Sequence, residues 1–463
     1  MRETLERELK LDAGEDFTLP ELDGTPLEPR VFTSTYHDTP RRSLARAGIT
    51  LRRRLEHGLG LWQLKLPVNG ARVELEEPGP PAAPPETLGR LLAAHLRHGD
   101  LEPVAVLRTR RTGLLVEQPA SAEVVVDEVA VLDGQRVVDS FREVEVELRE
   151  GDVAALEQIG HALRSAGAKR GDAQPKVFRV IGEPPPVRRN DAIRERIGAQ
   201  LDEILAHDPG TRLGADPESL HDFRVAVRRL RALLRTIRPL VDSTYSEPLR
   251  EELKWLGGLL GDVRDLDVLL EHLRDELAAL GTPDSMLGEG ALQALESERD
   301  AKRAALLEAL ATDRYFALLD ALEQTADTLA VKRKARIEKL AAKEFAKVRR
   351  DVKRAGESPS DTVLHEIRKR AKKARYAAEL VSGGSAARFV ADVKELQDVL
   401  GEHHDAIVAE QRLHALYANG VARDSLFALG RLFERERARA ARTRAAWPDA
   451  WERVRKSGLA AWK

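Results

Sequence analysis

The chain has 463 residues, of which 42% are hydrophobic and 33% are charged, so it is long enough for two or three folded domains and too apolar for a disordered protein. It contains no cysteine, which excludes a disulfide scaffold, a thiolate metal site and a cysteine nucleophile. The net charge is −2, from 75 basic and 77 acidic residues, and this near balance argues against a generic nucleic-acid coat.

We expect a cytoplasmic protein with no membrane partner. No run of 18 apolar residues occurs, as a membrane-spanning helix would require. The segment from Met1 to Glu8 lacks the apolar core of a signal peptide. The absence of cysteine also fits a reducing compartment.

The first part of the chain alternates apolar and polar residues with period two, which predicts β-strands. The predicted strands cover residues 5–11, 50–55, 61–66, 71–76, 104–112, 122–132 and 142–148. Helical patterns occur near 87–96 and at 152–165, and a proline-rich loop occupies 78–85.

Three consecutive prolines, Pro184 to Pro186, mark a stiff linker, which we place at 183–189 between an N-terminal domain (1–182) and a helical domain (190–463). Helical periodicity then covers most of the chain. The predicted helices are 191–206, 217–238, 246–280, 290–312, 327–355, 359–381, 385–400 and 405–417.

The helical domain repeats itself at a distance of about 140 residues. The segment from Leu220 to Arg224 corresponds to the one from Leu364 to Arg368, and Leu259 to Asp265 corresponds to Val399 to Asp405. We therefore expect two similar repeats, at about 190–325 and 326–463. If they face each other across a pseudo-two-fold axis, their basic helices meet at one groove.

Charged residues on the predicted strands fall at every second position and so share one face of the sheet. A solvated face of an open sheet accounts for any one strand, but a barrel with a charged lumen accounts better for all of them. Buried carboxylates require metal ions and buried cations require a polyanion, so we expect a phosphate chain bound with Mg²⁺ or Mn²⁺. The sets are Glu6, Glu8 and Lys10; Arg52 and Arg54; Gln63 and Lys65; Arg72, Glu74 and Glu76; Arg108 and Arg110; Glu123 and Asp127; and Glu143, Glu145 and Glu147.

In their order, these motifs resemble the CYTH family, the triphosphate tunnel metalloenzymes. The resemblance covers about residues 1 to 181, from Glu6-x-Glu8-x-Lys10 through Tyr36-His37-Asp38-Thr39 to Lys176-Val177-Phe178-Arg179. It implies an α+β, multidomain protein whose N-terminal antiparallel eight-stranded β-tunnel barrel, with flanking helices, hydrolyses a triphosphate. Such hydrolysis needs charge neutralisation and an in-line water rather than a side-chain nucleophile.

The resemblance also implies roles for individual residues, while which arginine between Arg108 and Arg111 faces the lumen stays open. The catalytic set is Glu6, Glu8, Lys10, Lys65, Glu143 and Glu145. The triphosphate-binding set is Lys10, Arg52, Arg54, Lys65, Arg108, Arg110, Arg111 and Lys176. The metal-binding set is Glu6, Glu8, Glu74, Asp127, Glu143, Glu145 and Glu147.

Cations also recur at helical spacing in the second domain. His221, Arg224, Arg228 and Arg231 lie on one helix face, and a second helix repeats the spacing. Like charges on one face repel each other, so a bound polyanion would stabilise both helices. A solvated charged face is the alternative for either helix alone. Aromatic residues are only 4% of the chain, which disfavours single-stranded nucleic acid because that ligand stacks on aromatic rings.

These motifs resemble the CHAD domain, the conserved-histidine α-helical domain, over about residues 190 to 463. The resemblance implies a C-terminal, all-α, duplicated four-helix bundle that binds inorganic polyphosphate, and we expect Asp265 and Asp405 to orient its cations. The matching positions are His221, Arg224, Arg228, Arg231, Arg264, His365, Arg368, Lys372, Arg375 and His404.

We therefore predict an inorganic triphosphatase, a phosphoanhydride hydrolase, joined to a polyphosphate-binding module and associated with polyphosphate granules. No adenine pocket is evident, which favours inorganic triphosphate over nucleotides. The alternatives are a non-catalytic polyphosphate-binding protein targeted to granules, a nucleotide or thiamine triphosphatase, and an adenylate cyclase. We expect no nucleic-acid partner.

Overall fold

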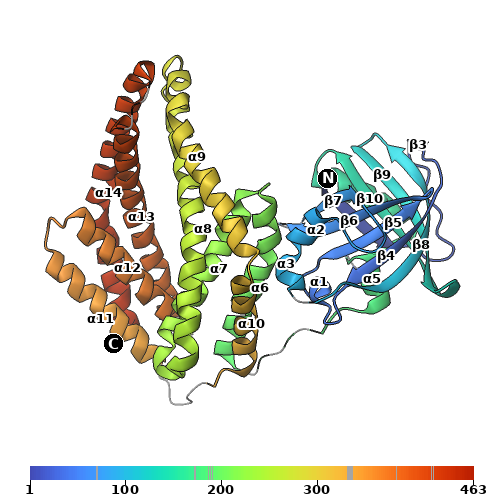
Figure 1. The fold of residues 1–463 in the computed structure, drawn as a ribbon, viewed down its shortest axis with the longest axis horizontal. Coiled ribbons are helices and arrows are strands. Elements are labelled where there is room, and N and C mark those ends of the chain that lie inside the picture. The colour runs from blue at the N-terminus through green and yellow to red at the C-terminus, as the bar shows by residue number, and fades with distance from the viewer. Residues whose placement is uncertain are drawn as a thin grey trace. The chain divides into compact units, whose positions relative to one another are not determined.

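The computed structural model describes residues 1–463 except 69–70, 98, 171–173, 186, 188, 190, 331–336, 382, 419, 421 and 463. The chain divides into two compact units. The first comprises residues 1–188 and 205–215, and the second comprises 189–204 and 216–463. An antiparallel sheet dominates the first unit and helices dominate the second, which confirms the predicted α+β class (Figure 1).

The sheet of the first unit pairs its strands in antiparallel fashion, in the order β1-β7-β6-β5-β4-β8-β9-β10-β2-β11, with β3 beside β8. The strands are β1 (Arg2–Glu6), β2 (Glu8–Asp12), β3 (Gly24–Pro26), β4 (Arg30–Asp38), β5 (Thr50–Glu56), β6 (Leu59–Val68), β7 (Ala71–Pro78), β8 (Glu102–Val116), β9 (Ser121–Asp133), β10 (Arg136–Glu150) and β11 (Lys169–Arg170).

The strand count differs from the predicted eight, because the described residues form an 11-stranded sheet. The predicted strand 5–11 is interrupted at Arg7, so that β1 pairs with β7 at one edge and β2 pairs with β10 near the other. No ladder joins β1 to β2 in the described part of the chain, so the sheet is an open path of pairings with β1 at one end and β11 at the other. The prediction also missed β4, whose sequence is rich in hydroxyl residues, and the short strands β3 and β11.

Helices cover the two apolar parts of the sheet's outer face. The helices α1 (Ser43–Arg46), α2 (Glu86–Leu91) and α3 (Ala93–Leu96) pack against β5, β6 and β7. The helix α4 (Val153–Ser165) packs against β2, β9 and β10, where the buried valines occupy even-numbered positions such as Val144 and Val146. Because side chains alternate along a strand, the odd-numbered residues of β10 point to the opposite, inner face.

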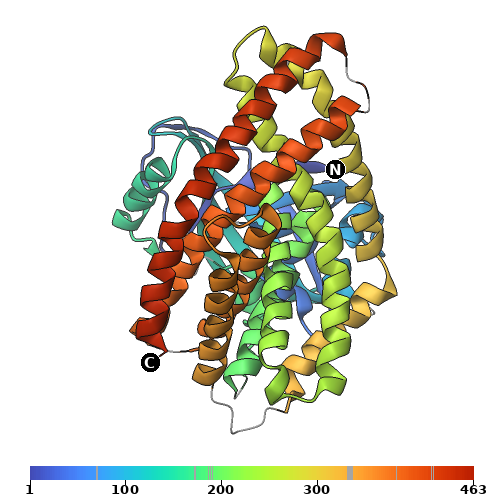
Figure 2. The same cartoon turned by 90° about the vertical axis from the view of Figure 1, so that its left-hand side faces the viewer.

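The second unit is built from long helices (Figure 2). They are α6 (Ala192–Leu213, which the division into units splits), α7 (Pro217–Thr236), α8 (Ser243–Ala278), α9 (Asp284–Leu310), α10 (Asp313–Thr328), α11 (Ile337–Ala355), α12 (Asp361–Ala378), α13 (Gly384–Ala418) and α14 (Leu426–Ala461). Asp216 and Ser360 cap the first turns of α7 and α12 by accepting backbone N–H groups.

Several helix predictions need correction. The predicted helices 385–400 and 405–417 form one helix, α13, which runs through Gly401 without a break. The prediction missed α10 and α14. Part of the predicted helix 327–355 lies outside the described residues, and α11 begins at Ile337.

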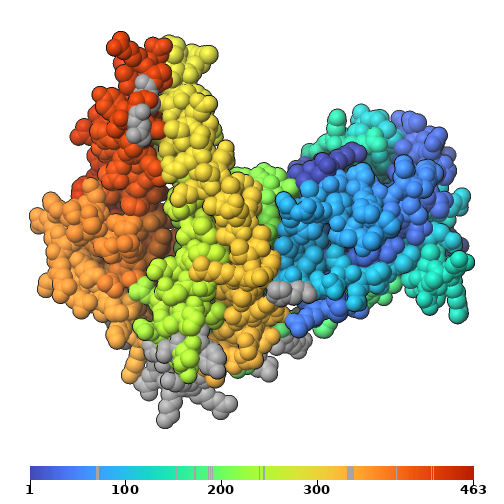
Figure 3. Space-filling model, viewed as in Figure 1, coloured from blue at the N-terminus to red at the C-terminus, as the bar shows by residue number. Residues whose placement is uncertain are grey.

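Apolar cores join the long helices of the second unit. One core joins α8, α9, α13 and α14, and another joins α11, α12, α13 and α14. Figure 3 shows the side chains of α9 in contact with those of α13 and α14 at the upper end of this unit. None of the described helices combines the length and the apolar character that crossing a membrane requires.

Candidate functional site

The inner face of the sheet gathers charged side chains into one network, which we call the charged cluster. Its members come from β1, β2, β5 to β10 and the short helix α5 (Lys176–Ile181). Their side chains are at most 15% exposed, apart from Glu147 at 32%. They are Glu6, Glu8, Lys10, Arg52, Arg54, Lys65, Glu74, Arg111, Asp127, Glu143, Glu145, Glu147 and Lys176.

Two lysines bridge carboxylates in this cluster. The Nζ atom of Lys10 lies 3.0 Å from Glu145 and 3.3 Å from Glu8, and that of Lys65 lies 2.6 Å from Glu6 and 3.6 Å from Glu74. Burial acts to lower the pKa of Lys10, but Glu145 and Glu8 outweigh it and raise that pKa. Burial raises the pKa of Glu6 to about 7, against the lowering effect of Lys65.

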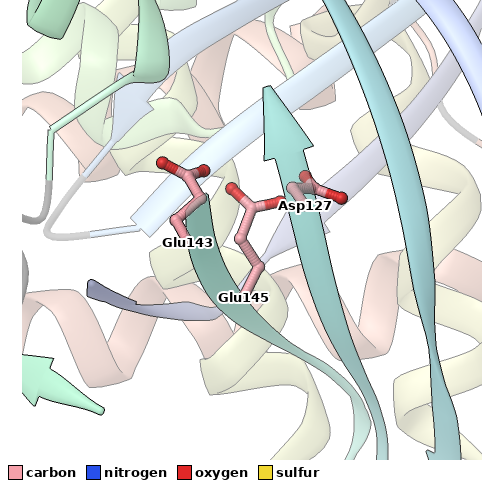
Figure 4. A group of neighbouring side chains, drawn as sticks. All are labelled: Asp127, Glu143 and Glu145. Atoms are coloured by element: carbon pink, nitrogen blue, oxygen red, sulfur yellow. The ribbon is translucent and has the colours of Figure 1, made fainter. Parts of the chain in front are cut away.

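Three carboxylates form a trio deep in the cluster (Figure 4). Asp127, Glu143 and Glu145 each offer an oxygen, and these atoms lie within 4.8 Å of one another. Burial raises the pKa of Glu143 to about 7. Burial acts in the same direction on Glu145, but the neighbouring cations, led by Lys10, lower its pKa. Closely spaced carboxylate oxygens are the donors that Mg²⁺ and Mn²⁺ prefer, so the residues of the trio fit a hard divalent cation.

Two arginines of β5 supply positive charge that is only partly neutralised. The Arg52 guanidinium donates hydrogen bonds to Gln63 (2.8 Å) and to the Tyr36 hydroxyl (3.1 Å). The Arg54 guanidinium lies 3.9 Å from the centre of the Phe32 ring and donates through Nη2 to Glu56 at 2.6 Å, while its buried Nε–H has no hydrogen-bond partner. Burial and the nearby Arg52 lower the pKa of Arg54 to about 10. A buried donor among like charges is a suitable contact for an anion.

The pairing register decides which arginine of β8 joins the cluster. Arg111 donates to Asp127 at 2.8 and 2.7 Å and to Glu145 at 2.5 Å. Arg108 and Arg110 are exposed on the opposite face, where Arg110 pairs with Glu128 at 3.3 Å. The structure therefore does not bring Arg108 and Arg110 into the cluster.

Sequence reasoning did not assign a role to the residues that support Arg52 and Arg54. The sequence did point to Gln63, because it shares a strand face with Lys65. It also pointed to Tyr36, which begins the motif Tyr36-His37-Asp38-Thr39. Phe32 had no signal, because the strand that carries it was not predicted.

In the second unit, α7 and α12 bring their basic stripes together. Arg224 and Arg228 of α7 act electrostatically on Lys372 of α12, as do Arg368 and Arg375 of its own helix. Burial, reinforced by these four arginines, lowers the pKa of Lys372 to about 7. We call Arg224, Arg228, Arg368, Lys372 and Arg375 the basic cluster.

Asp265 was expected to orient a cation of this domain, and it accepts a hydrogen bond of 2.7 Å from Arg224. A second feature was not expected: glycines make room for the arginines. A Cβ atom added to Gly401 would lie 2.9 Å from Nη2 of Arg368, and one added to Gly261 would lie 3.7 Å from Nη2 of Arg224.

The predicted histidines differ between the repeats. The rings of His365 and His404 lie 4.0 Å apart between centroids. Burial, with His404 as the next cause, lowers the pKa of His365 to about 4. In the first repeat, Arg264 is buried and pairs with Glu218 at 3.0 Å, and burial, with Arg264 next, lowers the pKa of the half-buried His221. The lowered pKa values leave these histidines neutral near pH 7. Arg231 is exposed further along α7.

Comparison with known proteins finds a family for each part of the chain. A CYTH domain model matches residues 4–177 and a CHAD domain model matches residues 195–414. The chain is a CYTH–CHAD protein. It is 30% identical over 484 aligned positions to the uncharacterized proteins MT2285 and Rv2226 of Mycobacterium tuberculosis strains CDC 1551 and H37Rv, with 93% of each chain covered.

Solved structures with partial similarity include PptA from Streptomyces chartreusis (24% identity, 56% of this chain and 98% of that chain, TM-score 0.49). The CHAD domain from the plant Ricinus communis is 25% identical over 60% of this chain and 94% of that chain, with a TM-score of 0.44. HpAC1 from Hippeastrum, described as having a dominant triphosphatase activity, is 16% identical over 39% of this chain and 98% of that chain, with a TM-score of 0.26.

Proposed function

We propose that the CYTH domain hydrolyses inorganic triphosphate with Mg²⁺ or Mn²⁺, and that the CHAD domain binds inorganic polyphosphate. The observation that carries the first half is the charged cluster, in which carboxylates at metal-binding spacing and buried cations share one inner face. We further propose that the segment through Arg7, which pairs with β7 through β1 and with β10 through β2, closes the sheet into a tunnel around this cluster.

The carboxylates and the cations of the charged cluster would have different roles in hydrolysis. A bound divalent cation supplies charge neutralisation for the phosphoryl group and its attacking water. Arg52, Arg54 and Arg111 present guanidinium groups to phosphate oxygens, which they grip with paired donors. Glu6 and Glu143 belong to the carboxylates that would hold the cation, and with a pKa of about 7 each becomes available to a cation as the pH rises through neutrality.

The aromatic residues beside these arginines support an inorganic substrate. Phe32 and Tyr36 are buried, at 3% and 4% exposure, and lie against Arg54 and Arg52, so neither ring is open for stacking on a base. A nucleotide enzyme needs a surface for the base, whereas a chain of phosphates needs only cations and metal.

The test is phosphate release from inorganic triphosphate by the full chain, with Mg²⁺, with Mn²⁺ and with a chelator. We expect release only with a divalent cation, and a preference for triphosphate over ATP at equal metal concentration. Faster release from ATP would contradict the proposed substrate. No release with either metal between about pH 6 and 10 would make the chain a binding protein rather than a triphosphatase.

Polyphosphate binding by the CHAD domain is supported by the mutual repulsion within the basic cluster. Burial and neighbouring arginines hold the pKa of Lys372 near 7, and a polyanion between α7 and α12 relieves that repulsion. Tethering the two domains on one chain would then raise the local concentration of phosphate polymer near the CYTH domain.

The variant Gly401→Ala is expected to weaken polyphosphate binding by roughly three- to tenfold, which corresponds to a net hydrogen bond. The new methyl group would displace the Arg368 guanidinium, at 2.9 Å, but the mobile end of that side chain can yield without loss of stability. Isothermal titration with short-chain polyphosphate measures the change.

Its matched control is Gly261→Ala in the other repeat, where the added carbon makes an ordinary contact of 3.7 Å with Arg224. Equal losses in the two variants would contradict the role given to Arg368. Equal affinities of Gly401→Ala and the unchanged protein would do so as well.

A further inference from the structure

Lys176 reaches the carboxylate trio from a helix rather than from a strand. Its Nζ atom lies 3.0 Å from Oε1 of Glu143 and 3.2 Å from Oε2 of Glu145, and it also contacts Oδ2 of Asp127. The side chain is 6% exposed. In the described part of the chain these three carboxylates form a group whose oxygens lie within 4.8 Å of one another, as a shared metal ion would require. A lysine ammonium and a divalent cation therefore compete for the same oxygens.

Among the described residues, four cations surround the trio. Arg111 contacts Asp127 and Glu145, Lys10 lies 3.0 Å from Glu145, and Arg179 lies 3.7 Å from Glu143. Lys176 differs from these three because it contacts all three carboxylates of the trio. A divalent cation that binds the trio must therefore displace the Lys176 ammonium, because two positive charges at the same oxygens repel each other.

The helix that carries Lys176 can leave the trio without breaking the sheet. The six-residue helix α5 contributes no strand to the sheet. It is held by the buried side chains of Val177 and Phe178, by Arg179, which pairs with Asp12 at 2.8 Å, and by Arg42, which donates a hydrogen bond of 2.5 Å to the Ile181 carbonyl. Withdrawal of Lys176 costs these contacts but no ladder hydrogen bond.

We propose that Lys176 is an internal competitor of the metal ion at the Asp127, Glu143 and Glu145 trio. The trio binds Mg²⁺ or Mn²⁺ only when the ammonium leaves, and α5 loosens as the cation enters. This inference rests on the proposed function for the class of cation, but its test measures binding and exchange rather than hydrolysis.

The test is the titration of the full-length Lys176→Met variant with Mn²⁺, followed by the electron paramagnetic resonance signal of the free ion. Methionine keeps most of the side-chain length and removes the charge. We expect Mn²⁺ affinity to rise roughly tenfold or more, because a competing positive charge is removed from a buried site. The control Lys169→Met removes an exposed lysine of β11 and should leave the affinity unchanged.

Two further measurements test whether the gain in Mn²⁺ affinity arises at the trio. One uses a second substitution and the other uses the unchanged protein. Adding Asp127→Asn to Lys176→Met should abolish the gain. In the unchanged protein, Mn²⁺ should speed hydrogen exchange of the amides of residues 176–181. Unchanged or weaker Mn²⁺ binding by Lys176→Met would overturn the inference, as would slower exchange of α5 with Mn²⁺. An unchanged protein that binds Mn²⁺ but releases no phosphate would contradict the proposed function alone.

Discussion

The double variant Glu6→Gln plus Glu8→Gln is expected to lower the turnover number for triphosphate by roughly three orders of magnitude, because metal-assisted charge stabilisation supplies several kcal/mol. Both side chains are about 11% exposed and lie on the inner face, where they pair with Lys65 (2.6 Å) and Lys10 (3.3 Å). Glutamine keeps their size but removes the charge that holds a divalent cation.

The same variant should not lose its affinity for triphosphate. Removing two carboxylates frees Lys65 and Lys10 to face phosphate oxygens, so the dissociation constant measured without metal should stay equal or fall. Turnover and binding therefore change in different directions, which a misfolded variant would not show. Phosphate release and isothermal titration measure the two quantities.

The matched control is Glu128→Gln, which removes a carboxylate from the outer face of β9, where it pairs with Arg110 at 3.3 Å. Its turnover should be unchanged. In the unchanged protein, turnover should rise as the pH passes 7, because the raised pKa of Glu6 leaves that carboxyl protonated, and unable to bind a cation, at lower pH. Full activity of the double variant would place the essential metal ligands elsewhere.

The variant Lys372→Met is expected to stabilise the CHAD domain while weakening its hold on polyphosphate roughly tenfold, the loss of one phosphate contact. Burial and four arginines lower the pKa of this lysine from the ordinary 10.5 to about 7, so its charged form is unfavourable in the free protein. Removing the ammonium relieves a penalty on the order of a few kcal/mol. Thermal unfolding and polyphosphate titration measure the two effects.

The pH dependence gives this prediction a second readout. A lysine with a depressed pKa costs stability fully below about pH 7, and the cost fades as the pH rises toward 10.5. Binding of a polyanion favours the charged form, so binding takes up a proton. Polyphosphate affinity of the unchanged protein should therefore fall roughly tenfold or more between about pH 7.5 and 9.5, and Lys372→Met should lack most of this dependence.

The control for this variant is Lys369→Met, which removes an exposed lysine one turn earlier on the same helix, paired with Glu366 at 2.6 Å. It should change the stability and the pH dependence little. A loss of stability in Lys372→Met, or a pH dependence equal to that of the unchanged protein, would contradict the repulsion argument.

The sequence alone determined which residues share a face. Period two placed Glu143, Glu145 and Glu147 together on one strand, and helical spacing placed Arg368 and Lys372 on one stripe, because both patterns depend only on local backbone geometry. The order of these motifs along the chain was enough to identify both families, as the matches to residues 4–177 and 195–414 confirm.

The tertiary structure alone decided which face is buried and what each charge meets. Pairing with β9 selects Arg111 rather than Arg108 or Arg110, since a strand's register depends on a partner distant in sequence. Contacts between distant segments also explain three other features. They are the break at Arg7, the approach of Lys176 to the trio and the effect of α7 on Lys372. Register, burial and through-space charge arise from contacts between segments far apart along the chain, and no local periodicity encodes them.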